Sequence, residues 1–456
     1  MKLSEHGCAA SEPVHMLVGN ATVITCDPAQ PVVRHGAVAV TGDKVVQVGP
    51  EAELRRRWPD ARFEDAGGRL LMPGMTCTHT HLYSTFARGM ALSRPAARCF
   101  REILERLWWR LDRALTEEDV GVSAAVALVQ CVKCGTTTIM DHHSSPNAID
   151  GSLDIIGEAV EKVGIRASLA YEVSDRDGPK ARDAGIAENV RFIKECERRP
   201  TARIRATFGL HASFTLSDET LERCAEAGHA LGAGFHVHTA EGPEDQALTL
   251  GSSGLRVVER FDRFGLWGPR SLAIHCVHVD HGEMEILRAR GAAVVHNPQS
   301  NMGNAVGAAP VLEMARRGML VGLGTDGYAM DMFESLRTAN LLAKHVAGDP
   351  QAGWVEARRM AFENNTAILA RHWEAPLGVL APGAYADMIA VDYDPPTPLT
   401  EANWFSHVLF GLPGAAVNTT IVGGQVLMRD GELLTVDERE LAARARELAA
   451  ALWNRI

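Results

Sequence analysis

Several features are scarce in this sequence, and each scarcity excludes a class of protein. Its 46 basic residues are outnumbered by 57 acidic ones, so the net charge is -11 and no basic surface for nucleic acid is expected. No apolar run approaches the roughly 20 residues of a membrane span. Residues 1–8 also lack the apolar core of an export signal. We therefore expect a cytoplasmic protein that binds neither nucleic acid nor membranes.

Cysteine is sparse as well. The chain has nine cysteines, an odd and scattered set, which in a long intracellular protein indicates reduced thiols. The only close pair, Cys131 and Cys134, has no second Cys or His pair at the spacing of a structural zinc site. We expect buried thiols and no disulfide framework.

Apolar residues are plentiful, and their pattern changes along the chain. They make up 46% of 456 residues, a length that favours a large domain with a smaller accessory one. Short valine- and threonine-rich runs with turn signals, typical of antiparallel strands, occur near both chain ends. We predict a composite β-sandwich of residues 1–68 and 376–436, a central domain of residues 69–375 and a C-terminal helix over 437–456.

The central segment alternates apolar strands with amphipathic helices. Eight such strands fit a (β/α)8 barrel, or TIM barrel, of the α/β class, whose chemistry lies at the C-terminal ends of the strands. The predicted strands lie near residues 75–81, 136–142, 166–172, 204–211, 234–240, 272–278, 292–297 and 321–326.

Several predicted strands end in a ligand-type residue. His79 and His81 are two apart on the first strand and so face the same side, His238 lies on the fifth, and Asp326 ends the eighth. Barrel closure brings these ends to one centre. Three neutral nitrogens and one carboxylate suit zinc or a similar divalent metal with a water molecule.

Two further residues are placed for catalysis. Glu241 follows His238 by three residues, where its carboxylate could accept a proton from the water and return it to a leaving group. His275 ends the sixth strand and is placed to polarise the substrate or hold the hydroxide. A single strand histidine is more often a packed core residue, but so many at successive strand ends favour a metal site.

Taken together, these motifs resemble the deaminase/chlorohydrolase branch of the amidohydrolase superfamily, and the likeness covers nearly the whole chain. Within that branch the chain looks most like the SsnA-type aminohydrolases, which are associated with purine breakdown. The branch motifs are residues 72–81, 238–241, 273–276 and 324–326, and the narrower likeness rests on residues 83–90, 107–112 and 171–178.

The resemblance implies roles for individual residues. It implies one divalent metal per chain, because the fourth strand ends at His211 without the bridging lysine of dinuclear branches. We expect this metal to be Zn²⁺, with Fe²⁺ and Mn²⁺ as alternatives. The resemblance also implies that His211 contacts the substrate and that Glu241 shuttles protons. The same likeness gives His275 a place beside the water and makes Asp326 a second proton acceptor.

Substrate recognition is predicted from position alone. Arg88 follows the first strand, and its guanidinium suits an oxo or carboxylate oxygen, although a surface or interdomain salt bridge is an equal alternative. Glu172 and Asn297 follow the third and seventh strands. The roles of four further residues stay open: Trp108, Trp109, Asp175 and Arg176.

The resulting prediction is a metal-dependent aminohydrolase that deaminates a purine-like nitrogen heterocycle. Three alternatives remain: a ring-opening hydrolase of a purine-derived cyclic amide, a triazine-type chlorohydrolase, and a non-catalytic scaffold on the same barrel. The expected partners are a small heterocyclic substrate and further copies of the chain in a dimer or larger homo-oligomer.

Overall fold

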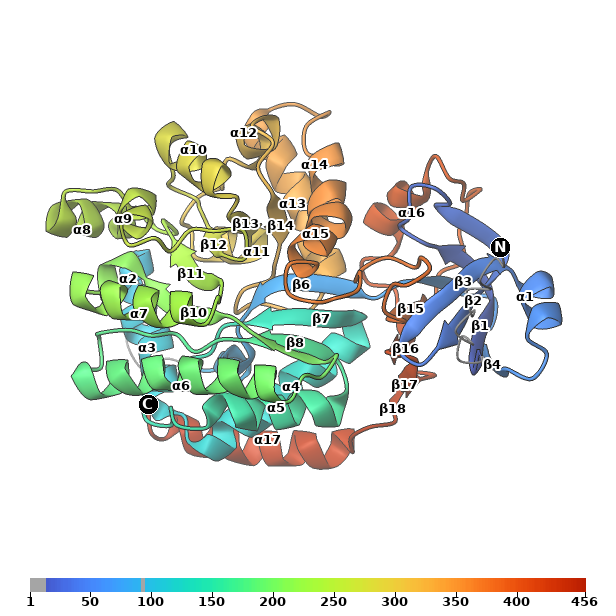
Figure 1. Cartoon of the computed structure of the whole chain (residues 1–456), viewed down its shortest axis with the longest axis horizontal. Coiled ribbons are helices and arrows are strands. Elements are labelled where there is room, and N and C mark those ends of the chain that lie inside the picture. Colours follow the sequence, from blue (N-terminus) through green and yellow to red (C-terminus); the bar gives the residue numbers. More distant parts are fainter. Residues whose placement is uncertain (1–13, 92–94) are drawn as a thin grey trace, which may run out of the picture.

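The computed structural model describes residues 14–91 and 95–456, which form a barrel and a neighbouring β-sheet (Figure 1). The predicted character of residues 1–8 therefore falls outside the described residues. The barrel strands are β6 (Met75–Thr80), β7 (Thr136–Asp141), β8 (Arg166–Leu169), β9 (Ile204–Ala206), β10 (Phe208–Ala212), β11 (Phe235–Thr239), β12 (Leu272–His275), β13 (Ala293–His296) and β14 (Val321–Leu323).

These strands pair in chain order as parallel neighbours. Two runs, β6 to β9 and β10 to β14, are joined by single bridges between Thr80 and Asp326 and between Val173 and Leu210. The fourth predicted strand is split at Thr207 into β9 and β10, so the barrel keeps eight positions. The predicted (β/α)8 architecture is confirmed.

Several strands are shorter than predicted. β12 ends at His275 and β14 at Leu323, where the predictions extended to 278 and 326. The chain turns there because His275, Cys276 and Asp326 take left-handed φ values of 71°, 50° and 56°, which bend the backbone away from the extended conformation of a strand.

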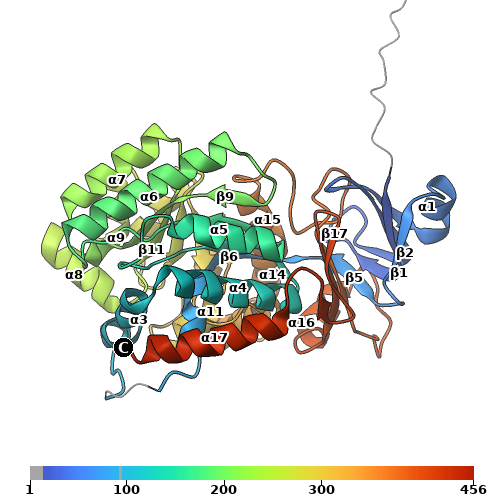
Figure 2. The same cartoon turned by 90° about the horizontal axis from the view of Figure 1, so that it is seen from below.

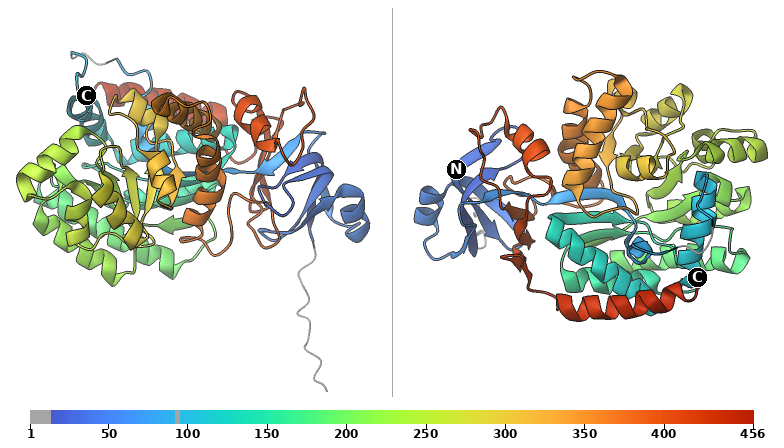
Figure 3. Two further views of the ribbon diagram at one scale, coloured as in Figure 1. Left: turned by 90° about the horizontal axis from the view of Figure 1, so that it is seen from above. Right: turned by 180° about the vertical axis from the view of Figure 1, so that it is seen from behind.

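Helices surround the barrel, as Figure 3 shows from two further directions. A capping box of Thr116 and Asp119 starts the long helix α4, and Gly135, with φ of 77°, ends it. The outer helices are α4 (Glu117–Cys134), α5 (Ser152–Val163), α6 (Pro179–Arg198), α7 (Asp218–Ala230), α8 (Pro243–Ser253), α9 (Val257–Arg263), α10 (His281–Arg290), α12 (Val311–Arg316), α13 (Met332–Ala347), α14 (Trp354–Arg358) and α15 (Asn365–Leu369).

Short helices lie over the C-terminal ends of the strands, and most of them carry pocket residues. Among the described residues, none of the helices has the length and hydropathy needed to cross a membrane. The short helices are η1 (Leu82–Ala87), α2 (Phe100–Ile103), the π-helical turn η2 (Leu104–Trp108), α3 (Trp109–Ala114), η3 (Ser213–Thr215) and α11 (Pro298–Gly303).

The second sheet has nine strands and is built from both ends of the chain, as the β-rich texture of those ends indicates. Its two parts meet where β5 pairs antiparallel with β15, Leu71 opposite Ala390. The exact domain limits stay predictions. The strands are β1 (Met16–Ile24), β2 (Val32–Thr41), β3 (Lys44–Pro50), β4 (Arg62–Asp65), β5 (Leu70–Pro73), β15 (Met388–Val391), β16 (Val417–Val422), β17 (Gln425–Arg429) and β18 (Glu432–Leu433), with α1 (Glu51–Arg57) and α16 (Trp404–Gly411) beside them.

Two features join the sheet to the barrel. Arg166 on β8 forms a buried, bidentate ion pair with Asp387 at 2.7 and 3.0 Å, and its guanidinium lies over the ring of Tyr385. The last helix, α17 (Glu438–Trp453), runs beside α4 (Figure 2). Its Trp453 donates a 2.8 Å hydrogen bond from Nε1 to the carbonyl of Phe86.

The cysteines behave as the sequence predicts. All eight in the described part of the chain are free, and Cys131 is fully buried.

Candidate metal and catalytic site

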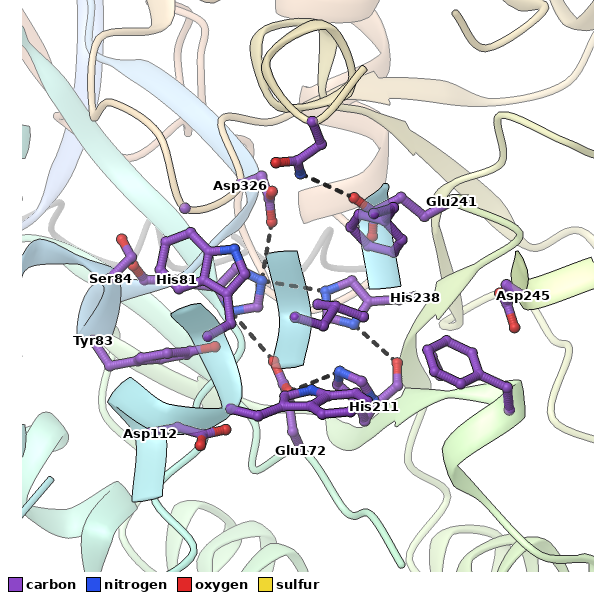
Figure 4. Close-up of a pocket in the computed structure, with 18 residues that line it drawn as sticks. His81, Tyr83, Ser84, Asp112, Glu172, His211, His238, Glu241, Asp245 and Asp326 are labelled. Atoms are coloured by element: carbon purple, nitrogen blue, oxygen red, sulfur yellow. Dashed lines mark hydrogen bonds and ion pairs between the residues drawn. The ribbon is translucent and has the colours of Figure 1, made fainter. Parts of the chain in front are cut away.

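Four side chains meet at the C-terminal end of the barrel, at the centre of the strand ring. Asp326 Oδ1 lies 3.1 Å from His79 Nε2 and 3.0 Å from His81 Nε2, and His81 Nε2 lies 3.2 Å from His238 Nε2. His81 and His238 point toward each other and toward Asp326 in Figure 4. These separations are close to the roughly 3.3 Å expected between tetrahedral ligands whose bonds to zinc are about 2.0–2.1 Å.

The outer nitrogens of the histidines are fixed by the protein. His81 Nδ1 donates to the carbonyl of His142 at 2.5 Å, and His238 Nδ1 donates to that of His211 at 2.9 Å. Since a carbonyl only accepts, both Nδ1 atoms carry protons and both Nε2 atoms face the centre. His79 Nδ1 is held by His236 Nε2 at 2.8 Å.

The charge of this cluster suits a cation. Burial lowers the pKa of His238 well below its usual value, so His238 is neutral. Burial acts on His81 in the same direction, but Asp326 and Glu172 outweigh it and raise the pKa of His81 to about 9. The negative charges that raise this pKa also favour a cation at the centre, and a divalent metal would compete with the proton for His81 Nε2. The residues present fit a metal ion.

His275 stands beside this cluster and could join it. Its Nε2 is buried, has no hydrogen-bond partner among the described residues, and lies in a possible ligand group with His79, His238 and Asp326. Asn301 Oδ1 accepts from its Nδ1 at 2.8 Å, which leaves Nε2 as an acceptor.

Glu241 faces His275 from the next strand end. Its Oε2 lies 3.4 Å from His275 Nε2, and the side chain is almost wholly buried in the pocket wall. Burial, reinforced by the negative charge of Asp326, raises the pKa of Glu241 well above its usual value. A carboxyl with these properties can hold and return a proton near neutral pH.

The backbone takes an uncommon conformation at three strand ends of the site. Ala240, His275 and Asp326 all take left-handed φ values, of 49°, 71° and 56°, at the ends of three different strands. Such values are uncommon for residues other than glycine and cluster at functional sites. These backbone conformations turn the chain at the strand ends, so that the side chains there point toward the cluster of His79, His81, His238 and Asp326.

A pocket opens onto the cluster under the short helices (Figure 4). Trp108 and Trp109 both line it, although core packing is the usual default for such residues. The two adjacent side chains share one cavity where a π-helical turn passes into α3. Other lining residues include Tyr83, Phe100, Leu104, Asp112, Glu172, His211, Phe214, Glu241, Asp245 and Asn304.

Glu172 and His211 form the inner wall of the pocket, and their contact with a substrate stays a prediction. Glu172 Oε1 lies 3.3 Å from His81 Nδ1 and 3.4 Å from His142 Nδ1, and Glu172 Oε2 lies 4.0 Å from His211 Nε2. Burial raises the pKa of Glu172 to about 7. His211 Nδ1 donates to Thr215 Oγ1 at 2.8 Å, so its Nε2 is left to accept a hydrogen bond in the pocket.

Two predicted substrate residues are not in the pocket. Arg88 follows η1 and turns outward to Gln130, to which it donates a 3.0 Å hydrogen bond. Asn297 is fully buried behind the strand ends, where its Oδ1 lies against Gly324. Both residues follow barrel strands, as predicted, but the backbone after each strand directs the side chain away from the pocket.

The residues left open have structural partners. Asp175 accepts from Ser217 N at 2.6 Å and from Thr220 Oγ1 at 2.7 Å, so it anchors the start of α7. Arg176 is buried against Asp112, with which it forms a short ion pair.

Sequence reasoning missed two residues of this region. His142 directly follows β7 and packs flat against His236 with ring centroids 4.4 Å apart, and the strand-end rule would have selected it. Asn304 lines the pocket and contacts Glu241, but it lies in a loop after α11 where no periodic pattern applies.

Comparison with known proteins shows which family this chain belongs to. The model of the amidohydrolase family matches residues 70–427. The chain belongs to the amidohydrolase family. A shorter match, over residues 36–61, is to a bacterial imidazolonepropionase-like composite domain, in the sheet that both chain ends build.

Relatives of this amidohydrolase that match over nearly their full length include proteins named as deaminases. The 5-methylthioadenosine/S-adenosylhomocysteine deaminase of Pelotomaculum thermopropionicum is 34% identical over 446 residues, 97% of this chain and 99% of the relative. The 5'-deoxyadenosine deaminase of Methanosarcina mazei is 34% identical over 447 residues, again 97% and 99%.

Solved structures with the same fold include a deaminase and a chlorohydrolase. A zinc-bound adenosine deaminase from Xanthomonas campestris superimposes with a TM-score of 0.85 at 27% identity, covering 97% of this chain and 99% of that one. Atrazine chlorohydrolase from Arthrobacter aurescens TC1 gives 0.77 at 24% identity, covering 95% and 100%, and shows the fold alone. The predicted class, a metal-dependent hydrolase of carbon–nitrogen bonds in the deaminase branch, is confirmed. The narrower SsnA-type likeness and the cytoplasmic location stay predictions.

Proposed function

We propose that this amidohydrolase is a hydrolytic deaminase that binds one zinc ion per chain and removes the exocyclic amine of a purine, with adenosine-type nucleosides as the first candidates. The observation that carries the proposal is the meeting of His79, His81, His238 and Asp326 beside Glu241 in one pocket. The names of the relatives, which refer to adenosine derivatives, favour a purine with an amino group.

The chemistry of the site follows from its groups. His79, His81, His238 and Asp326 would hold a divalent cation, which would lower the pKa of a water molecule toward neutrality. Glu241 accepts one proton as the water oxygen adds to the ring carbon, and it then donates that proton to the exocyclic nitrogen. The carbon–nitrogen bond breaks and ammonia leaves. Asp326 accepts the remaining hydroxyl proton and returns it to the ring nitrogen beside the new carbonyl.

Four pocket side chains would hold the ring. His211 Nε2 is free to accept a hydrogen bond from an N–H or O–H group of the substrate, and Glu172 is a further acceptor when ionised. The indoles of Trp108 and Trp109 offer flat apolar surface against which a purine can stack.

Ammonium release tests the proposal. The zinc-loaded protein would be assayed with adenosine, 5'-deoxyadenosine, methylthioadenosine, guanine, oxopurines and pterins, with ultraviolet spectra recorded in the same wells. We expect ammonium in step with the spectral change of a purine. Loss of ring absorbance without ammonium would instead establish ring opening, and chloride release from a chlorotriazine would establish a chlorohydrolase. No turnover of any compound would favour the scaffold.

Glu241→Gln separates metal binding from catalysis. Glutamine keeps the size of the side chain and cannot take up a proton, so we expect kcat to fall by at least about 100-fold while zinc content per chain stays unchanged. His79→Ala is the matched variant and should lose both zinc and activity. A fully active Glu241→Gln protein would disprove the proposed proton transfer.

A further inference from the structure

The short helix α11 and the residue that follows it contact three groups of the site. Ser300 Oγ forms a short hydrogen bond to Asp326 Oδ2, and Asn301 Oδ1 accepts from His275. Asn304 Nδ2 lies 3.3 Å from Glu241 Oε1 and 3.2 Å from Ser300 Oγ. Of the three polar side chains, only Asn304 also lines the pocket.

The hydrogen-bond directions around Asn304 are determined by its partners. Ser300 has one hydroxyl proton, and it is donated to Asp326, so the Ser300 oxygen must accept from Asn304. The hydrogen bond to Glu241 is likewise donated by Asn304 Nδ2. Both protons of the Asn304 amide nitrogen are therefore in use.

The amide oxygen is then the free end of the side chain. Asn304 Oδ1 has no hydrogen-bond partner among residues 14–91 and 95–456, and the residue is only partly buried in the pocket wall. Because an amide oxygen only accepts, it can recognise a substrate group that carries a hydrogen and cannot recognise one that lacks it. Its neighbour Glu241 is the proton donor for the leaving group.

We propose that Asn304 determines leaving-group specificity: its amide nitrogen positions Glu241, and its amide oxygen accepts a hydrogen bond from the departing amino group. This inference rests on the proposed deaminase function. When Glu241 transfers its proton to the exocyclic nitrogen, that nitrogen carries three hydrogens. One of them points to Asn304 Oδ1 while the carbon–nitrogen bond breaks. A chloride leaving group has no hydrogen and needs no proton, so it gains nothing from this contact.

The inference is tested with two substrates that share a ring. Adenosine and 6-chloropurine riboside differ only in the leaving group, and both give the same product with the zinc enzyme. The variant Asn304→Leu keeps the side-chain size and removes both polar atoms. We expect kcat/KM for adenosine to fall by about tenfold or more, and kcat/KM for the chloride to fall far less. The ratio of the two constants should therefore shift by about tenfold.

Controls make the result interpretable. Met302→Leu lies on the same helix, is more than half exposed, and should leave both constants and their ratio unchanged. Asn304→Ala repeats the test if leucine disturbs folding, and zinc content verifies that the ligands are intact. An equal loss for both substrates, or no loss for either, overturns the role of Asn304 while the deaminase function stands. A wild-type protein that processes neither substrate nor any other amine overturns both.

Discussion

At the scale of single residues, burial keeps several carboxyl groups of the pocket from ionising easily. Asp245, in the first turn of α8, is almost fully buried and accepts a 2.8 Å hydrogen bond from Ala240 N. Burial raises its pKa from 3.8 to about 7. Because the folded protein holds this proton more tightly than the unfolded chain, the contribution of Asp245 to stability is greatest below about pH 4 and declines until about pH 7.

Asp245→Asn should remove this decline. We expect the difference in Tm between the variant and the wild type to become more positive from pH 5 to pH 8, measured on metal-free protein. The histidine ligands titrate in both proteins, so their effect cancels in the difference. Asp60→Asn, at an exposed turn, is the control and should show no such trend. A Tm difference that stays constant over this range would contradict the raised pKa.

The residues of the metal cluster could be predicted because their signals are local. His79 and His81 are visible as a period-two pair, and His238 and Asp326 follow apolar strand runs. Asn304 and the Asp112–Arg176 pair depend instead on how separate loops pack over the barrel. The same dependence explains Arg88, whose position in sequence says nothing about the direction in which its loop turns.

At the scale of elements, barrel closure depends on one glycine. Gly324 lies where the chain leaves β14 and passes β6, and a Cβ there would lie 2.7 Å from the carbonyl oxygen of His79 and 2.5 Å from Asn297 Oδ1. The backbone amides of Thr325 and Asp326 both donate to that carbonyl. The close approach is therefore what carries Asp326 to the two histidines of β6.

Gly324→Ala should separate these strands. We expect a loss of about 1–3 kcal/mol in unfolding free energy and a clear loss of zinc affinity, because Asp326 moves away from His79 and His81. Denaturant unfolding and a zinc competition assay measure the two effects. Gly318→Ala, in the turn before β14 with no neighbour within 4 Å, tests whether strain at a glycine alone explains the loss. Unchanged zinc affinity in Gly324→Ala would contradict this account.

The order of the barrel elements was predictable, since apolar strand runs and helical patterns alternate. Their ends were not, because left-handed residues such as His275 stop a strand without a glycine or proline to mark the position. The division of the fourth strand at Thr207 also has no sequence signal, since the residues on both sides have strand character.

At the scale of the whole molecule, a buried ion pair links the barrel to the sheet that both chain ends build. Arg166 and Asp387 are both almost fully buried, and Gly423 N donates to the same carboxylate at 2.8 Å. Arg166→Ala would leave Asp387 buried and without its charge partner, and we expect a loss of about 3–5 kcal/mol in unfolding free energy.

A surface pair provides the comparison. Arg69 and Asp392 lie 2.5 Å apart but are partly exposed, so Arg69→Ala should cost less than about 1 kcal/mol. The double variant Arg166→Met with Asp387→Leu should recover much of the stability lost in Arg166→Ala, because no unpaired charge remains. Equal losses for the two arginine variants in urea unfolding would show that burial of the pair is unimportant.

The composite sheet also imposes an order on biosynthesis. Strands β1 to β5 leave the ribosome first, but β15, the partner of β5, follows only after the entire barrel has been translated. Until then the nascent chain presents β5 as an open strand edge, the kind of edge to which other chains attach. If translation stops within the barrel, the β5 edge therefore stays unpaired, and only the synthesis of β15 protects that edge from aggregation.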